Sequence, residues 1–172
     1  LGSALEAIEE DPEGGLLVRT ANGRCDRVDM VILAIGVRPE NRLAQDAGLA
    51  LGPRGHIVTD EHLRTSDPDI YAVGDAIQVI NPVTQAPCAV PLAGPANRQA
   101  RIAADHITGD AEARYRGTLG TSIVKVFDLT VATTGTNARG LEAAGIPFAA
   151  SVTHSQDHVT YYPGATEQSI RL

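Results

Sequence analysis

A glycine–aspartate pair, Gly74-Asp75, is the part of this 172-residue sequence that best combines residue type and position for chemistry. It follows a short apolar run, Ile-Tyr-Ala-Val at residues 70–73, whose lack of helical spacing predicts a buried strand. A carboxylate at the carboxyl end of a strand lies where open α/β sheets bind ligands, so Asp75 could accept hydrogen bonds from sugar or ribitol hydroxyls. Gly74 has no Cβ and would let the ligand approach closely. The alternative is an ordinary strand followed by a Gly-Asp turn.

The whole segment 65–76, Thr-Ser-Asp-Pro-Asp-Ile-Tyr-Ala-Val-Gly-Asp-Ala, is more specific than the pair alone. It resembles the second FAD-binding motif of the flavin-dependent pyridine nucleotide–disulfide oxidoreductases. In that family the aspartate that matches Asp75 holds the ribitol chain of FAD. The resemblance implies that Gly74, Asp75 and Ala76 contact this cofactor.

A helix is predicted directly after Gly94, with Pro95 at its first position. Apolar residues recur at helical spacing along one narrow stripe, and Gly109 provides the C-terminal stop. The stripe consists of Ala96, Ala100, Ala103 and Ile107. We expect it to pack closely against a sheet or a cofactor.

Free amides at Leu92, Ala93 and Gly94 would carry the partial positive charge of this helix N-terminus. They would stabilise the pyrimidine carbonyl of a flavin, which gains negative charge on reduction. The alternative is an ordinary amphipathic helix, since every helix has such an end. Residues 91–101 are similar to the flavin-contacting helix of the coenzyme A-disulfide reductase and NADH oxidase/peroxidase branch, which implies that these three residues contact FAD.

The N-terminal region predicts a three-stranded meander over residues 4–33, with turns at 11–15 and 22–23. The mostly apolar run 28–35 predicts a strand buried on both faces. Residues 34–41 are similar to the signature that closes the NAD(P)H domain of the same family, with Glu40 inserted before Asn41. This implies that Ala34 and Gly36 lie near the nicotinamide and the flavin.

Connections follow. Asn41 is expected to cap a short helix to Ala47, residues 56–59 to form a strand, and residues 81–91, with three prolines, to be irregular.

Residues 115–172 predict an α+β sandwich: strands at 122–127, 129–134, 148–154 and 168–172, and a helix at 137–144 capped by Thr136. The layout resembles the dimerisation domain of the same branch in an incomplete form and implies a homodimer formed through 115–172. Tyr161 and Tyr162 match a tyrosine region that reaches the partner's active site in that branch, which implies a catalytic, substrate-side role. The alternative is an aromatic pair that packs the sheet.

Composition narrows the function classes. A net charge of −7 argues against nucleic-acid or anionic-membrane partners, and the longest apolar run is too short for a membrane span. The two cysteines, Cys25 and Cys88, form no paired motif and suit the cytoplasm. His154 and His158 would share a strand face, but Asp157 would point the opposite way, so no metal site is predicted.

The predicted fold class is therefore α/β and α+β: the C-terminal part of a FAD/NAD(P)-binding flavoprotein with two dinucleotide domains, plus a dimerisation domain. The expected segments are 1–48, ending the NAD(P)H domain, 49–114, ending the FAD domain, and 115–172. No glycine-rich dinucleotide fingerprint is present, and the chain begins Leu-Gly-Ser, so we expect a piece of a longer protein that is inactive alone.

The implied enzyme passes electrons from NAD(P)H through FAD to a disulfide, persulfide, peroxide or oxygen. A cofactor-free self-association module and a ferredoxin reductase-type flavoprotein are the alternatives.

Overall fold

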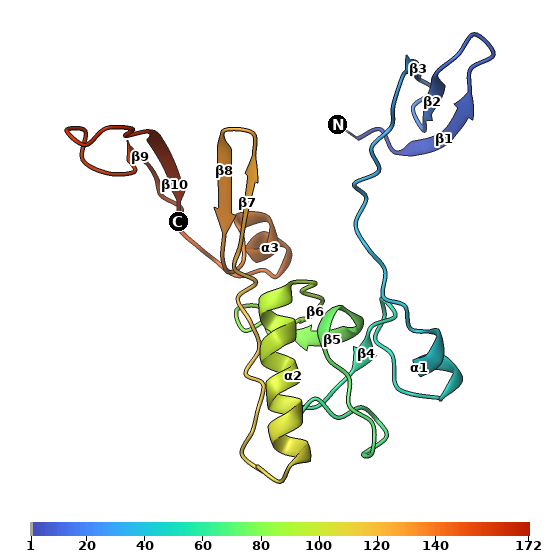
Figure 1. Ribbon diagram of the computed structural model, residues 1–172, viewed down its shortest axis with the longest axis vertical. Coiled ribbons are helices and arrows are strands. Elements are labelled where there is room, and N and C mark those ends of the chain that lie inside the picture. The colour runs from blue at the N-terminus through green and yellow to red at the C-terminus, as the bar shows by residue number, and fades with distance from the viewer. Residues whose placement is uncertain (1) are drawn as a thin grey trace. The chain divides into compact units, whose positions relative to one another are not determined.

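The computed structural model describes residues 2–172, which divide into two compact units, 2–38 and 39–172 (Figure 1). The expected three-segment division, with boundaries after residues 48 and 114, stays a prediction.

The first unit is a three-stranded antiparallel sheet of β1 (Leu5–Glu10), β2 (Leu16–Thr20) and β3 (Cys25–Val28), in that order. Its turns form where the sequence predicts them: the Gly14 N–H donates to the Asp11 carbonyl, and the Gly23 N–H to the Thr20 carbonyl, both at 2.8 Å. A three-stranded meander is confirmed, but it ends at Val28 and not at residue 33.

The expected strand at 28–35 is wrong beyond Val28, where β3 ends and an extended, unpaired segment begins. Its apolar side chains are open to solvent, from 59% exposed at Leu33 to 82% at Ile32 and Ile35. An apolar run becomes a buried strand only when neighbouring strands supply hydrogen bonds and covering faces, and no described residue pairs with this segment.

The core of the second unit lies between a small sheet and its longest helix. Strand β5 (Ile77–Ile80) pairs in parallel with β4 (Ile57–Val58) and antiparallel with β6 (Pro87–Cys88). The buried cluster unites Leu63 from a loop, Ile77 and Val79 from β5, and Ala103 from α2 (Ala93–Ile107). Residues 81–91 are therefore not wholly irregular, because β6 returns along β5 as a hairpin.

The helix α1 (Arg42–Asp46) follows Asn41 as expected, and Gly48 after it has a φ of 71°. The Asn41 side chain does not cap it, however. Its Nδ2 donates instead to the Gly55 carbonyl at 2.6 Å, which ties the helix start to the loop before β4.

The C-terminal region contains two separate hairpins and one short helix. The hairpins are β7 (Ser122–Val126) with β8 (Leu129–Thr133), and β9 (Val152–Gln156) with β10 (Glu167–Arg171). The helix α3 (Ala138–Ala143) is capped by Asn137, whose side chain accepts the Gly140 N–H at 3.0 Å, and not by Thr136.

Three of the strands appear close to where they are predicted, whereas the one expected at 148–154 begins only at Val152 and continues to Gln156. The half-buried face and the single sandwich do not appear. All of β8, β9 and β10 is exposed, and no ladder joins the two hairpins. Burial of these strands requires a covering layer that residues 2–172 do not supply.

Candidate cofactor site

Gly74 and Asp75 lie in a single 3-10 turn, η1 (Gly74–Ala76), that leads into β5. The expected strand at 70–73 is wrong: only Tyr71 forms an isolated bridge, to Arg64, and Ile70 and Val73 are more than one-third exposed. Asp75 therefore precedes a buried strand rather than following one. Gly74 adopts a φ of 81°, a conformation that glycine enters without a Cβ penalty.

The Asp75 side chain is exposed, and within residues 2–172 its carboxylate makes no hydrogen bond or ion pair. The turn packs against α2: a Cβ built on Gly74 would lie 3.8 Å from the Ala96 Cβ. An unpartnered carboxylate and a glycine beside the first turns of a helix fit a ligand that brings hydroxyl donors and needs close backbone approach.

The N-terminus of α2 differs from the expectation at two residues. Leu92 is the N-cap, and its N–H already donates to the Val90 carbonyl at 2.9 Å, so it is not free. Pro95 occupies the third helical position rather than the first. The intrahelical bonds begin with the Ala96 N–H donating to the Leu92 carbonyl at 3.2 Å, which leaves Ala93 and Gly94 as first-turn amides.

The buried face of α2 is rotated from the predicted alanine stripe. Gln99 and Ala103 are buried, whereas Ala100 is exposed and Ile107 is 61% exposed. Sequence reasoning missed Gln99 because a polar residue does not count in an apolar pattern. Its i, i+4 spacing to Ala103 is the signal that could have found it.

Gln99 contacts the turn that carries the candidate carboxylate. Its side-chain Oε1 accepts the Gly74 N–H at 2.7 Å. At the far end of the same helix, the Tyr71 hydroxyl lies 2.7 Å from His106 Nδ1, and the rings of His62 and His106 stack with centroids 4.3 Å apart. Segment 71–76 is thus held to α2 at both ends.

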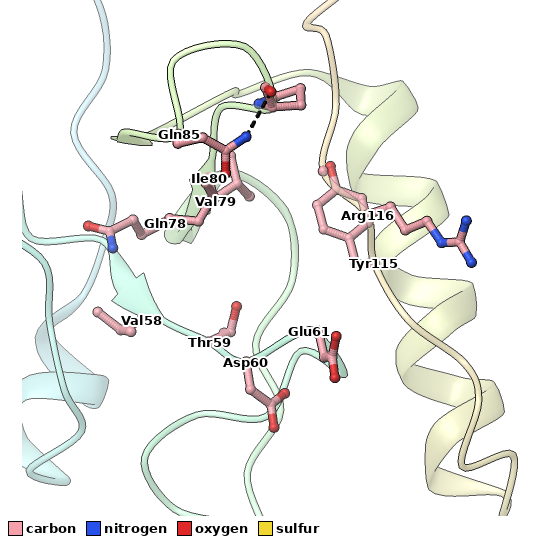
Figure 2. A pocket seen from close by; sticks show the side chains of 12 residues that line it. Val58, Thr59, Asp60, Glu61, Gln78, Val79, Ile80, Gln85, Tyr115 and Arg116 are labelled. Carbon is pink, nitrogen blue, oxygen red and sulfur yellow. Dashed lines mark hydrogen bonds between the residues drawn. The ribbon is translucent and has the colours of Figure 1, made fainter. Parts of the chain in front are cut away.

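A cavity of about 390 Å³ opens beside β4 and β5 (Figure 2). Asp60 and Glu61 line it on one side, and Tyr115 and Arg116 lie across from them. Burial raises the pKa of Asp60, but the Arg64 N–H and guanidinium and the His62 N–H outweigh it and lower that pKa below 3.8. None of the predicted cofactor-binding residues lines this cavity.

A second cavity, of about 660 Å³, lies beside the start of α2 and includes Gly94, Pro95 and Arg98. Tyr115 lines both cavities and packs against the core. Its hydroxyl is buried without a hydrogen-bond partner. Of the predicted residues, Gly94 is the one that borders a cavity of this size.

Ala34 and Gly36 belong to the first unit, within its extended, exposed segment. Gly36 has a φ of 86° and nothing within 4 Å of a built Cβ. Their approach to a nicotinamide or flavin stays a prediction, because the two units are described separately.

Tyr161 and Tyr162 lie on the loop between β9 and β10, 79% and 59% exposed, with ring centroids 4.9 Å apart. The alternative in which they pack the sheet is wrong, since both rings face solvent. A substrate-side role for either stays a prediction.

Both histidines of the β9–β10 hairpin have local partners. His154 Nδ1 lies 2.8 Å from Ser169 Oγ, and His158 Nδ1 lies 2.9 Å from Asp157 Oδ1. Cys25 is exposed, and burial raises the pKa of the Cys88 thiol. Between residues 2 and 172 there is no cluster of three or more metal-ligating side chains, nor a helix long and apolar enough to cross a membrane.

Comparison with known proteins identifies the class of protein. The solved structures that this chain resembles are FAD/NAD(P)-binding flavoprotein oxidoreductases of mixed helix and strand, as the sequence predicts. The family model for pyridine nucleotide-disulphide oxidoreductases matches residues 1–93, and the chain belongs to this family, whose cofactors are FAD and NAD(P)H.

Individual relatives lie in the predicted branch. The chain is 36% identical over 151 residues to an NADH oxidase of Methanocaldococcus jannaschii, covering 88% of this chain and 33% of that protein. It is 32% identical over 164 residues to the coenzyme A disulfide reductase of Staphylococcus aureus strain JH9, covering 95% and 37%. The crystal structure of reduced Bacillus anthracis CoADR-RHD superposes with a TM-score of 0.89 and 50% identity, covering 98% and 30%. The chain therefore spans about a third of the length of the curated relatives it matches.

Proposed function

We propose that this chain is part of a flavoprotein that passes electrons from NAD(P)H through FAD to a disulfide, persulfide, peroxide or oxygen acceptor. One observation supports this most directly: an exposed carboxylate that has no partner among residues 2–172, Asp75, lies on a glycine turn packed against the first turns of α2. Family membership and the names of the relatives agree with it.

Two features of the chain would serve the cofactor. Asp75 would accept hydrogen bonds from the ribitol hydroxyls, and the absence of a side chain at Gly74 would allow the ribitol to lie close to the backbone. The amides of Ala93 and Gly94 would favour negative charge beside the start of α2. FAD, when bound, supplies the electron-transfer chemistry, while these groups bind and orient it.

The experiment replaces Asp75 by alanine in the full-length protein and compares bound FAD per polypeptide and NAD(P)H consumption with the wild type. Because the carboxylate has no other partner, we expect FAD affinity to fall at least tenfold with little change in stability. Asp69→Ala is the matched control, since Asp69 is also an exposed carboxylate in the preceding loop without a side-chain hydrogen bond.

Unchanged FAD stoichiometry and turnover in Asp75→Ala would remove Asp75 from the site. A colourless full-length wild-type protein would favour the cofactor-free self-association module instead.

We further propose that the protein is a homodimer through residues 115–172. The hairpin β7–β8 exposes apolar side chains on both strands, including Ile123 at 72% and Leu129 at 66%, and at its turn, where Phe127 is 92% exposed. Such a concentration of exposed apolar side chains is typical of a surface that another protein layer covers. A second copy of the same domain supplies that layer in this proposal.

A further inference from the structure

Gln99 is the single polar residue among residues 2–172 that is buried as a whole, with 2% of its surface exposed. It lies on the face of α2 that packs against η1. Buried polar groups are stable only when hydrogen-bonded, and Gln99 finds its partner in the backbone N–H of Gly74, at 2.7 Å. The bond joins the middle of the helix to the residue directly before Asp75.

The identity of the partner fixes the orientation of the amide. A backbone N–H can only donate, so the Gln99 oxygen, not its nitrogen, must face Gly74. Gln99 thus provides a neutral acceptor at this point. Glutamate would provide an acceptor as well, but would place a second negative charge near Asp75.

The Gln99 oxygen binds Gly74, a residue with an unusual backbone conformation. Gly74 has a φ of 81° and begins the 3-10 turn after an extended Val73, and a Cβ built on it would meet only the Ala96 Cβ within 4 Å. An external acceptor on the Gly74 amide is therefore an effective way to select one conformation of this turn.

We propose that Gln99 is a positioning residue that sets the direction of the Asp75 carboxylate by holding the Gly74 amide. The inference rests on the proposed function, because the carboxylate must be directed at FAD for its position to matter. Gln99 itself touches no cofactor in this proposal and acts through Gly74.

The test uses Gln99→Met in the full-length protein, since methionine is similar in length and lacks the strong acceptor. Tyr71→Phe is the matched control: it removes the other hydrogen bond between this segment and α2, at His106, without touching η1. In the apoprotein, hydrogen–deuterium exchange of the peptide covering residues 73–77 should become about tenfold faster in Gln99→Met but not in Tyr71→Phe. Gln99→Glu keeps an oxygen acceptor for the Gly74 N–H, so exchange of residues 73–77 should stay as slow as in the wild type.

The second measurement is FAD affinity in a double-mutant cycle with Asp75→Ala. We expect Gln99→Met to weaken FAD binding about tenfold and to add little once Asp75 is alanine, because both changes act on the same contact. Tyr71→Phe should weaken binding less than twofold in either background.

The outcomes separate the two proposals. Unchanged exchange at residues 73–77, or a loss of affinity that is additive with Asp75→Ala, would overturn the role of Gln99. Undiminished FAD affinity in Asp75→Ala would overturn the proposed site, while the exchange measurement would still decide whether Gln99 holds the turn. If Gln99→Met does not fold, Gln99→Glu must keep slow exchange for the role to stand.

Discussion

Asp75 and Gln99 are both next to Gly74, but their environments differ. Asp75 is exposed and has no partner among the described residues, whereas Gln99 is buried and bonded to the Gly74 amide. Asp75 could be chosen as a candidate from the sequence, because a Gly-Asp pair after an apolar run is visible there. Gln99 was missed, since a glutamine does not count in an apolar pattern, and only its i, i+4 spacing to Ala103 marks it as facing the core.

The glycine itself provides a prediction. At Gly74, a Cβ would meet only the Ala96 Cβ at 3.8 Å, an ordinary contact, so the cost of Gly74→Ala comes from the backbone φ of 81°. We expect the free energy of unfolding to fall by about 1–2 kcal/mol, measured from urea denaturation of the full-length apoprotein.

The control for this prediction is Gly94→Ala, at a helical position with open space around it. It should be neutral, or stabilising by up to about 1 kcal/mol. Equal destabilisation by both substitutions would contradict a conformational origin.

At the scale of elements, the sequence predicts turns and the glycines that end helices better than strands or N-caps. The turns at 11–15 and 22–23 and the stop at Gly109 are set by local chemistry and appear as expected. The strands expected at 28–35 and 70–73 do not form, because a strand depends on partners that may be distant in sequence. The face of α2 was misjudged for a similar reason: Gln99 is buried by its bond to Gly74, not by hydropathy.

The β9–β10 hairpin provides a prediction about pH. The Thr166 N–H and hydroxyl donate to Asp157 at 3.0 and 3.2 Å, and His158 lies beside it. The Thr166 N–H is the largest of the causes that lower the pKa of Asp157 below 3.8. Because the folded pKa is below the unfolded one, the stabilisation is present above the unfolded pKa and is lost as pH falls through the folded pKa.

Exchange protection of the Thr166 amide should therefore persist at pH 5 and be lost in acid, as the pH falls through the lowered pKa of Asp157. Asp157→Asn should abolish this pH dependence. A protection profile that is the same in both proteins would show that Asp157 does not hold the loop.

At the scale of the whole molecule, the sequence predicts the family and the class of fold correctly, and the structure adds which surfaces lack a covering layer. The hairpin β7–β8 was expected to be half-buried and is exposed, since a strand's own alternation does not reveal what lies against it. In the proposed homodimer, the second copy covers this surface.

Phe127→Asp tests this surface in the full-length protein. Phe127 is 92% exposed at the turn between β7 and β8, so the substitution should leave the monomer folded while a charge disfavours apolar association. We expect light scattering coupled to size-exclusion chromatography to show a shift from dimer to monomer. Leu43→Asp, at an 87% exposed position on α1, is the control and should stay dimeric.

The extended segment after β3 has a practical consequence. Within residues 30–37 it presents Met30, Ile32, Leu33, Ile35 and Val37 to water with unpaired backbone groups between them. Such a stretch can recruit a copy of itself edge to edge. Recombinant production of residues 1–172 by themselves should therefore yield inclusion bodies, and a lysine at Ile32 or Ile35 should improve the soluble yield.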